Sequence, residues 1–336
     1  CEISHVGGQV YPRGTGAIWN LRVCHGTIFI DCTVGLDSHG DVTLWQTSAA
    51  AGSYVMYEVG DIALDGDTMV YYVCTTAHSN QGGTTFAAWR AANPTHWDPT
   101  PSTFDFVPLL IKARTNEHND GNTFIKPIIN LPDGNKITGV YTTTTIGQGI
   151  RDVVRIETTA GSSEGGSGNM TFIDPIFDYG TRYGIHVRGP VGALGNMGNI
   201  QFLGGRSTIV QNKAAGLSPT LKVDNAVDTA VDLRFQSFTF NAWDSPCVDM
   251  SGVAASVKNS VRLSDCKLAD RRNGAGTPKE TAITCNVPGL SVKGCKVQPS
   301  QMDEAAEFNR FVKFTVDCAS YEITDNDASV CLVDPI

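Results

Sequence analysis

Basic clusters, long apolar runs and helical periodicity are all scarce in this chain of 336 residues. The 25 Lys and Arg are outnumbered by 34 Asp and Glu, and they are spread along the chain. Without a basic patch or run, no nucleic-acid binding is expected. No apolar stretch approaches the roughly 20 residues that a membrane span needs, so no membrane insertion is expected either.

Familiar motifs for metals and nucleotides are missing as well. The ten cysteines include no Cys-x-x-Cys pair and no Cys/His cluster with zinc-like spacing. No helical pattern follows the glycines between Gly192 and Gly198, which excludes a nucleotide-binding loop. The seven histidines are scattered, and no Ser/His/Asp set stands out. We therefore expect no metal and no cofactor.

The composition itself is typical of β structure. Val, Ile, Thr and Phe recur in short runs that end at Asn, Asp, Gly or Pro. Residues 300–314 are the one stretch with helix-like spacing. Because the chain is long and its cysteines fall at repeat positions, we expect buried free thiols, although a disulfide framework is the alternative. The chain begins with Cys1 rather than Met, so we expect a processed or trimmed piece.

Short alternating strands recur at nearly constant intervals in the second half of the chain. Equivalent apolar residues follow one another after 28 to 33 residues: Phe172, Phe202, Phe235, Leu263, Val292 and Ile323. A second set of strands lies between them, beginning near Tyr183, Pro219, Cys247, Ala282 and Phe311. A strand pair of this size cannot bury its apolar face alone, so we expect the repeats to stack as coils about 4.8 Å apart.

Alternation along each strand predicts which side chains enter the coil. Val261 and Leu263 should point inward, and Arg262 and Ser264 outward. Stacking places like residues on like, which would explain two files of cysteines: Cys266 with Cys295, and Cys285 with Cys318. Sharp turns with left-handed backbone are expected at three further positions: Asp265, Gly294 and Asp325.

This repeat resembles the right-handed parallel β-helix of pectate-lyase-like proteins and phage tailspikes. The resemblance implies an all-β fold, with a right-handed parallel β-helix of about 30 residues per coil over residues 146–336 and a small N-terminal β module. An antiparallel β-sandwich is the competing fold, but it gives no reason for a repeat of this length.

The N-terminal part divides into three further segments. Residues 1–44 are interpreted as an N-terminal β segment or an early coil, because Leu21 to Val34 reads like Ala282 to Val297. In the second case residues 45–100 form a module inserted after that coil; otherwise the N-terminal segment is a cap for the open end of the stack. Residues 101–145 are polar and turn-rich and are interpreted as a connector and cap.

Aromatic residues concentrate in residues 45–100. Their order, a Trp, then Tyr-x-x-Gly-Asp, Tyr-x-Cys and a further Trp, resembles the small chitin-binding-type carbohydrate modules. The resemblance implies that sugar rings stack on Tyr57, Tyr72, Trp89 and Trp97. The alternative is that these rings form the core of the module itself. Trp97 lies in a Pro-rich segment and is expected to be the most exposed, and a hairpin is expected around Asp65 and Gly66.

Catalysis on such a scaffold would need specific side chains on the outer faces. A glycoside hydrolase needs two carboxylates, and a lyase needs a base such as His or Tyr beside Arg or Lys. The candidate acids are Asp174, Asp178, Asp232, Asp244, Asp249 and Glu164. The candidate lyase residues are Tyr183, His186 and Arg188, of which the last two share one face of a strand. Turn-forming aspartates and a charged surface ladder explain the same residues without catalysis.

Taken together, the two resemblances imply a phage tailspike or tail-fibre-like receptor-binding protein. It would act outside the cell as part of the virion tail, bind a host cell-surface polysaccharide and contact other tail or baseplate proteins. A homotrimer is expected, with Phe238, Phe240 and Trp243 as outward apolar residues. The alternatives are a polysaccharide depolymerase on the same β-helix, and a structural virion spacer without glycan activity.

Overall fold

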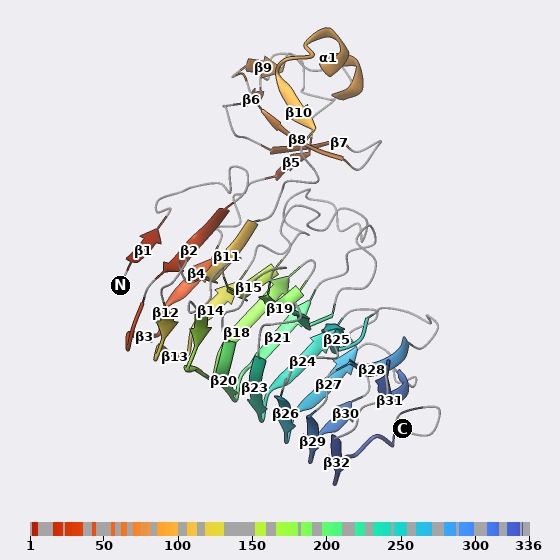
Figure 1. Ribbon diagram of the computed structural model, residues 1–336. Helices are drawn as coiled ribbons and strands as arrows, with labels where there is room; N and C mark the ends of the chain where they lie inside the picture. Colours follow the sequence, from red (N-terminus) through yellow and green to blue (C-terminus); the bar gives the residue numbers. More distant parts are fainter. Residues whose placement is uncertain are drawn as a thin grey trace.

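The protein is a stack of β-coils with a small module set apart from it (Figure 1). The computed structural model describes residues 2–5, 16–22, 24–35, 42–44, 55–57, 62–65, 70–74, 76, 78–80, 86–99, 106–112, 118–130, 152–158, 166–180, 183–189, 197–209, 219–225, 231–242, 245–253, 260–270, 279–286, 289–298, 308–315, 321–329 and 331. Within them no helix is long and apolar enough to cross a membrane.

Three long sheets form the sides of the stack, and we number them I, II and III. Sheet I contains β1 (Glu2–His5), β2 (Gly16–Arg22), β11 (Phe106–Lys112), β15 (Asp152–Glu157), β19 (Tyr183–Gly189), β22 (Leu221–Asn225), β25 (Val248–Val253), β28 (Lys279–Cys285) and β31 (Phe308–Phe314). Sheet II contains β3 (Ile28–Ile30), β13 (Thr123–Ile125), β17 (Met170–Ile173), β20 (Met197–Leu203), β23 (Val231–Gln236), β26 (Ser260–Ser264), β29 (Leu290–Lys293) and β32 (Tyr321–Thr324). Sheet III contains β4 (Thr33–Gly35), β14 (Ile128–Asn130), β18 (Ile176–Gly180), β21 (Arg206–Ile209), β24 (Thr239–Ala242), β27 (Lys267–Asp270) and β30 (Lys296–Gln298).

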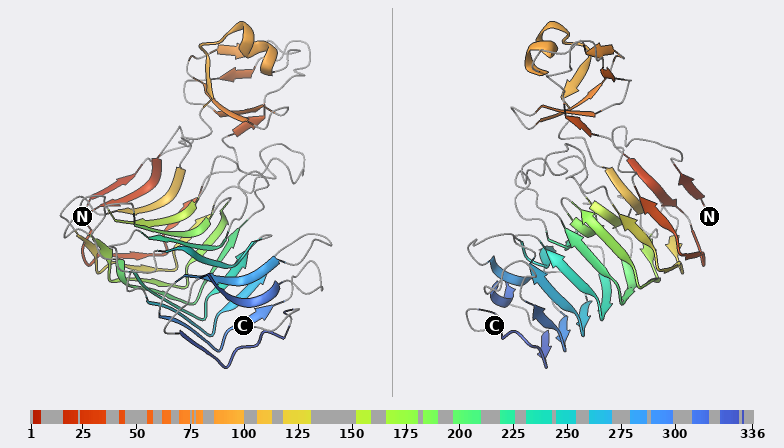
Figure 2. Two further views of the ribbon diagram at one scale, coloured as in Figure 1. Left: turned by 45° about the vertical axis from the view of Figure 1, so that its right-hand side comes forward. Right: turned by 180° about the vertical axis from the view of Figure 1, so that it is seen from behind.

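Strand direction confirms the expected parallel β-helix. Apart from β1, which runs antiparallel to β2, each strand of the three sheets pairs in parallel with the strand of the next coil. A coil takes about 31 residues. Figure 2 shows the coils one behind another, with the chain passing from sheet I to II to III in each. The antiparallel sandwich is thereby excluded.

The register confirms the apolar file read from the sequence. Phe172 pairs with Phe202, Phe202 with Phe235, and the file continues through Leu263, Val292 and Ile323. Toward the N-terminus it extends to Phe124 and Phe29. The five phenylalanine rings stack face to face with centroids 4.5 to 4.8 Å apart. Such pairs add to the burial of the rings themselves, so this file is the centre of the core.

The corner between sheets II and III always takes two residues. The first has left-handed backbone, with φ of 54° at Asp265, 64° at Gly294 and 58° at Asp325, as expected from the sequence. The amide of Asp265 donates to the carbonyl of Lys293 in the next coil at 2.9 Å. A Cβ on Gly294 would approach Asp265 Oδ1 at 2.4 Å, so Gly is needed for space as well as for φ.

The corner between sheet III and the next strand of sheet I varies greatly in length. Two residues join β18 to β19, whereas 70 residues, 36–105, separate β4 from β11. Despite that separation, β11, β13 and β14 pair with β2, β3 and β4 in register. The coil stack therefore includes residues 16–35 and 106–130. Residues 16–35 thus match the early-coil alternative for residues 1–44, whereas residues 106–130 lie in the segment that the sequence suggested to be a connector and cap.

Alternation of apolar and polar residues correctly predicts which side chains point into the core within a strand, but it fails across the corner between sheets II and III. Val261 and Leu263 are fully buried and Arg262 is exposed, as expected. Phe238 and Phe240, expected to face outward, are also fully buried. The left-handed residue Ser237 (φ 54°) turns the chain and places the following strand on a new side of the same core. These two rings are therefore not available for trimer contacts, and Trp243 lies outside the described residues.

Other expectations from the sequence have mixed outcomes. Residues 308–314, expected in a helix, form β31. Among the described cysteines Cys247, Cys266, Cys285 and Cys295 are buried thiols that form no disulfide, whereas Cys24 is disulfide-bonded. The Cys266–Cys295 file is confirmed by the register, because the residues that follow them, Lys267 and Lys296, pair with each other and both thiols are buried. For the second expected file, Cys285 with Cys318, the residue that pairs with Cys285 in the next coil is Phe314. Cys318 itself lies outside the described residues.

The small module contains the only helix of the described residues, α1 (Phe86–Ala92). Its strands are β5 (Val42–Leu44), β6 (Val55–Tyr57), β7 (Ile62–Asp65), β8 (Val70–Cys74), β9 (His78–Asn80) and β10 (Trp97–Pro99). The expected hairpin is present, since β7 and β8 pair antiparallel with Asp65 opposite Val70. Strand β10 adds to the other edge of β8.

Candidate functional site

Two polar features of the coil stack are candidates for function. The first is a row of charged residues on the outer face of sheet I. The second is a groove where the chain enters sheet II.

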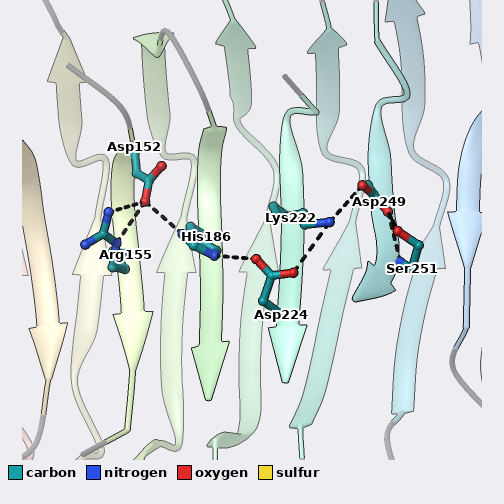
Figure 3. Close-up of polar contacts among 7 residues, drawn as sticks. All are labelled: Asp152, Arg155, His186, Lys222, Asp224, Asp249 and Ser251. Carbon is teal, nitrogen blue, oxygen red and sulfur yellow. Dashed lines mark hydrogen bonds and ion pairs between the residues drawn. The ribbon is translucent and has the colours of Figure 1, made fainter. Parts of the chain in front are cut away.

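The charged row crosses four strands of sheet I, from β15 to β25 (Figure 3). Strand pairing sets Arg155, His186, Lys222 and Asp249 side by side, because each occupies the same outward position of its coil. Asp152 and Asp224 lie between these residues, so acidic and basic groups alternate along the row. We call these six residues the charge ladder.

His186 sits at the centre of the charge ladder and is only 4% exposed. Its Nδ1 lies 2.8 Å from Asp152 Oδ2, and its Nε2 lies 3.0 Å from Asp224 Oδ2. Ionised carboxylate oxygens only accept hydrogen bonds, so with both aspartates ionised the geometry favours a ring that donates from both nitrogens and carries a positive charge. Burial by itself would lower the pKa of His186, but the charge and hydrogen bonds of Asp152 and Asp224 outweigh burial and raise it.

The other half of the charge ladder is satisfied in the same way. Lys222 Nζ lies 2.9 Å from Asp249 Oδ2 and 3.5 Å from Asp224 Oδ1. Burial would lower the pKa of Lys222, but the hydrogen bond and charge of Asp249 raise it. Burial would raise the pKa of Asp224, whereas hydrogen bonding to His186 and the charge of Lys222 hold it low. Ser251 completes the row by donating to Asp249 Oδ1 at 2.6 Å.

This geometry favours a structural role for the charge ladder. A doubly protonated His186 held by two carboxylates has no lone pair with which to remove a proton, as the base of a lyase must, so catalysis by His186 stays a prediction. Its ring does contact Tyr183, with centroids 4.8 Å apart, and Arg188 is exposed two residues further along the same face. Alternation in the sequence predicts the shared face of His186 and Arg188, but the state of His186 depends on two aspartates 34 and 38 residues away.

The groove has a volume of about 500 Å³ and runs across five successive coils. It is lined by His118, Asp120, Gly166, Gly168, Asn169, Gly198, Asn199, Val231, Asp232 and Ser260. Two of these segments form a short two-stranded sheet, β12 (His118–Asp120) with β16 (Gly166–Gly168), at the approach to sheet II. At the β-sheet spacing, five coils give a groove about 19 Å long.

Amide side chains form a small ladder on the wall of the groove. Asn199 Nδ2 donates to Asn169 Oδ1 at 3.2 Å, and Gln201 Nε2 donates to Asn199 Oδ1 at 2.8 Å. Asn169 and Asn199 have left-handed backbone, with φ of 48° and 55°, as Asn tolerates well. Asn169 directly precedes β17 and Asn199 lies within β20, and the two are 30 positions apart, so the period that revealed the core could also reveal them.

Two carboxylates also line the groove. Asp120 Oδ1 lies 2.8 Å from His25 Nδ1, and Asp232 Oδ2 accepts from Arg234 Nη2 at 3.1 Å. The other oxygen of Asp232, Oδ1, is buried and has no hydrogen-bond partner. Asp120 and Asp232 are three coils apart, which separates their backbones by about 14 Å. Glycosidase pairs are about 5 Å or 6.5–9.5 Å apart, so the backbone spacing does not favour these two as a hydrolase pair.

The remaining candidate acids lie apart from the groove. Asp174 is the exposed left-handed residue of a II–III corner, with φ of 48°, which is a turn-forming role. Asp178 is buried and its Oδ2 lies 2.8 Å from Arg206 Nη2. Asp249 belongs to the charge ladder. Asp244 and Glu164 lie outside the described residues, and the described residues hold no His/Cys/Asp/Glu group that could bind a metal ion.

The aromatic residues of the small module form mainly its core. Tyr72 and Trp97 are 4% and 3% exposed, so the expectation that Trp97 is exposed is wrong. The Trp97 ring packs edge-on against Phe86, and its Nε1 donates to His78 Nε2 at 3.2 Å. Trp89 is half-buried against His78, with ring centroids 4.1 Å apart. The side chain of Tyr57 lies outside the described part, so sugar binding by Tyr57 and Trp89 stays a prediction.

Comparison with known proteins adds no relative. The chain matches no protein-family model, no curated protein and no solved structure. Its fold and its groove are therefore the basis for any statement about function.

Proposed function

We propose that the protein is a receptor-binding protein of the phage tailspike or tail-fibre kind, and that its groove binds a host cell-surface polysaccharide. The observation that carries the proposal is the groove itself, which is about 19 Å long, crosses five coils and is lined in part by polar side chains. A channel of that length and regularity fits an extended polymer better than a compact small molecule.

The lining of the groove suits a carbohydrate. The described lining includes two amides, two carboxylates, a hydroxyl and an imidazole, together with three glycines and Val231. A sugar presents many hydroxyl groups, each of which both donates and accepts, and these side chains offer matching partners at repeated intervals. The stacked coils hold these groups on a rigid framework, so little conformational entropy is lost on binding.

The resemblance of the coil repeat to tailspikes extends the proposal to the biological setting. In that setting the protein acts in the virion tail as a homotrimer attached to other tail or baseplate proteins. Cleavage of the glycan is the alternative activity, but the spacing of Asp120 and Asp232 and the protonated His186 favour binding without cleavage.

The experiment is a binding screen against capsular polysaccharides and lipopolysaccharides, with His118→Ala and Asp232→Asn as groove variants. Lys267→Ala is the matched control, because Lys267 is exposed on sheet III, away from the groove. We expect the groove variants to weaken binding about tenfold, a typical loss for one hydrogen-bonding anchor, and the control to bind normally. If no glycan binds, or if all three variants bind like the parent protein, the proposal fails. A reducing-end assay on the bound glycan tests for cleavage.

A further inference from the structure

The groove has a one-sided charge. Its described lining contains the two carboxylates Asp120 and Asp232 and no Lys or Arg. Among the basic side chains beside these carboxylates, His25 is paired with Asp120 and Arg234 with Asp232, and the lining itself adds the imidazole of His118. We propose that the groove selects neutral or amino-bearing polysaccharides and rejects acidic ones, an inference that rests on the proposed glycan binding.

Asp232 provides the most direct reason. Its Oδ2 accepts from Arg234, while its Oδ1 is buried without any donor. A buried acceptor without a donor is unfavourable. The Asp232 side chain is 28% exposed, and a rotation that brings Oδ1 to the groove surface would let a ligand O–H or N–H supply the missing donor. A sugar hydroxyl or ammonium group can do so. An ionised ligand carboxylate has no proton to donate and adds charge repulsion.

The amide wall fits the same class of ligand. The side-chain oxygens of Asn169 and Asn199 already accept hydrogen bonds from neighbouring amides. The wall therefore offers N–H donors, which suit the oxygens of neutral hydroxyl groups. It offers no positive charge that could compensate the negative charge of a uronate, sialate or phosphate group. Donors on this wall and carboxylate acceptors at Asp120 and Asp232 together match groups that both donate and accept.

The size of the expected discrimination follows from Coulomb's law. A ligand carboxylate placed about 4–6 Å from one groove carboxylate in water binds roughly three- to sixfold more weakly than a neutral equivalent. A repeating acidic polymer places several charges along the groove. We therefore expect a loss of at least fivefold for acidic polysaccharides at low salt, and a smaller loss as added salt screens the charges.

The test uses hexamers of three kinds: N-acetylglucosamine (neutral), glucosamine (amino-bearing) and galacturonate (acidic), together with the same three classes within the polysaccharide screen. Binding is measured by calorimetry at low and high salt for the parent protein, Asp232→Asn and Lys267→Ala. We expect neutral and amino-bearing glycans to bind at least fivefold more tightly than acidic ones. Asp232→Asn should narrow that ratio, and Lys267→Ala should leave it unchanged.

The outcomes separate this inference from the proposed function. Binding of acidic glycans as tight as that of neutral ones, or a ratio unchanged in Asp232→Asn, overturns the charge selection while leaving glycan binding intact. Absence of binding to any class overturns both. If Asp232→Asn does not fold, judged by its circular dichroism and melting temperature, Asp120→Asn replaces it with the same expectation.

Discussion

The phenylalanine file makes the coil stack testable by a single truncation at its centre. Phe202 is fully buried and stacks against Phe172 at 4.8 Å and Phe235 at 4.5 Å. Removal of a buried Phe side chain costs about 3–5 kcal/mol. Two stacked ring pairs at about 0.5–1.5 kcal/mol each account for about 1–3 kcal/mol of that loss. Phe202→Ala should therefore be destabilised by about 3–5 kcal/mol, and Phe202→Leu, which keeps most of the apolar volume, by about 1–3 kcal/mol.

The measurement is equilibrium urea denaturation followed by far-ultraviolet circular dichroism. Gln236→Ala is the matched control, because Gln236 is exposed at the outer face of the neighbouring strand and should change the free energy of unfolding by less than about 0.5 kcal/mol. Equal stability of Phe202→Ala and Gln236→Ala would refute the buried register. Equal stability of Phe202→Leu and the parent protein would show that ring stacking adds nothing to burial.

Three further predictions concern other parts of the fold. Because the pKa of His186 is raised in the folded protein, its stabilising effect is full below about pH 6.5 and is lost as pH rises through the folded pKa; His186→Gln should flatten melting temperature against pH over that range, and an unchanged profile would contradict a charged ring. Gly294→Ala should cost more than about 1 kcal/mol in urea denaturation, since φ is 64° and the new methyl would meet Asp265, and a neutral result would count against the corner geometry. Trp97→Ala should unfold the small module, with a loss of about 3–5 kcal/mol seen as faster proteolysis within residues 42–99, because Trp97 is buried; retained protease resistance would restore it as a surface residue.

The parallel repeat is the reason that so much of the fold could be predicted from the sequence. In a stack of similar coils, residues about 30 positions apart become neighbours, so a local pattern also specifies long-range contacts. The file from Phe172 to Ile323 and the corner residues Asp265, Gly294 and Asp325 were read correctly for this reason. The small module has no such repeat, so spatial neighbours cannot be inferred in this way. The exposure expected for Trp97 is therefore wrong, because Trp97 is buried.

Other features depend on details that alternation does not contain. The faces of Phe238 and Phe240 were misassigned because the left-handed residue Ser237 changes the direction of the chain between two strands. The state of His186 depends on carboxylates from two neighbouring coils, whose approach requires the exact register of sheet I. The groove collects residues from five coils, and none of His118, Asn169 or Asn199 is distinctive by itself.

The contrast between the two corners described above has a practical meaning. The corner between sheets II and III keeps a constant length of two residues. The corner that returns to sheet I accommodates an insertion of 70 residues, and Phe29 still pairs with Phe124 in register. Foreign domains could be grafted at that return point, or the native module exchanged, while the shaft stays the same. The inserted module can therefore change while the sequence and packing of the coil stack stay the same.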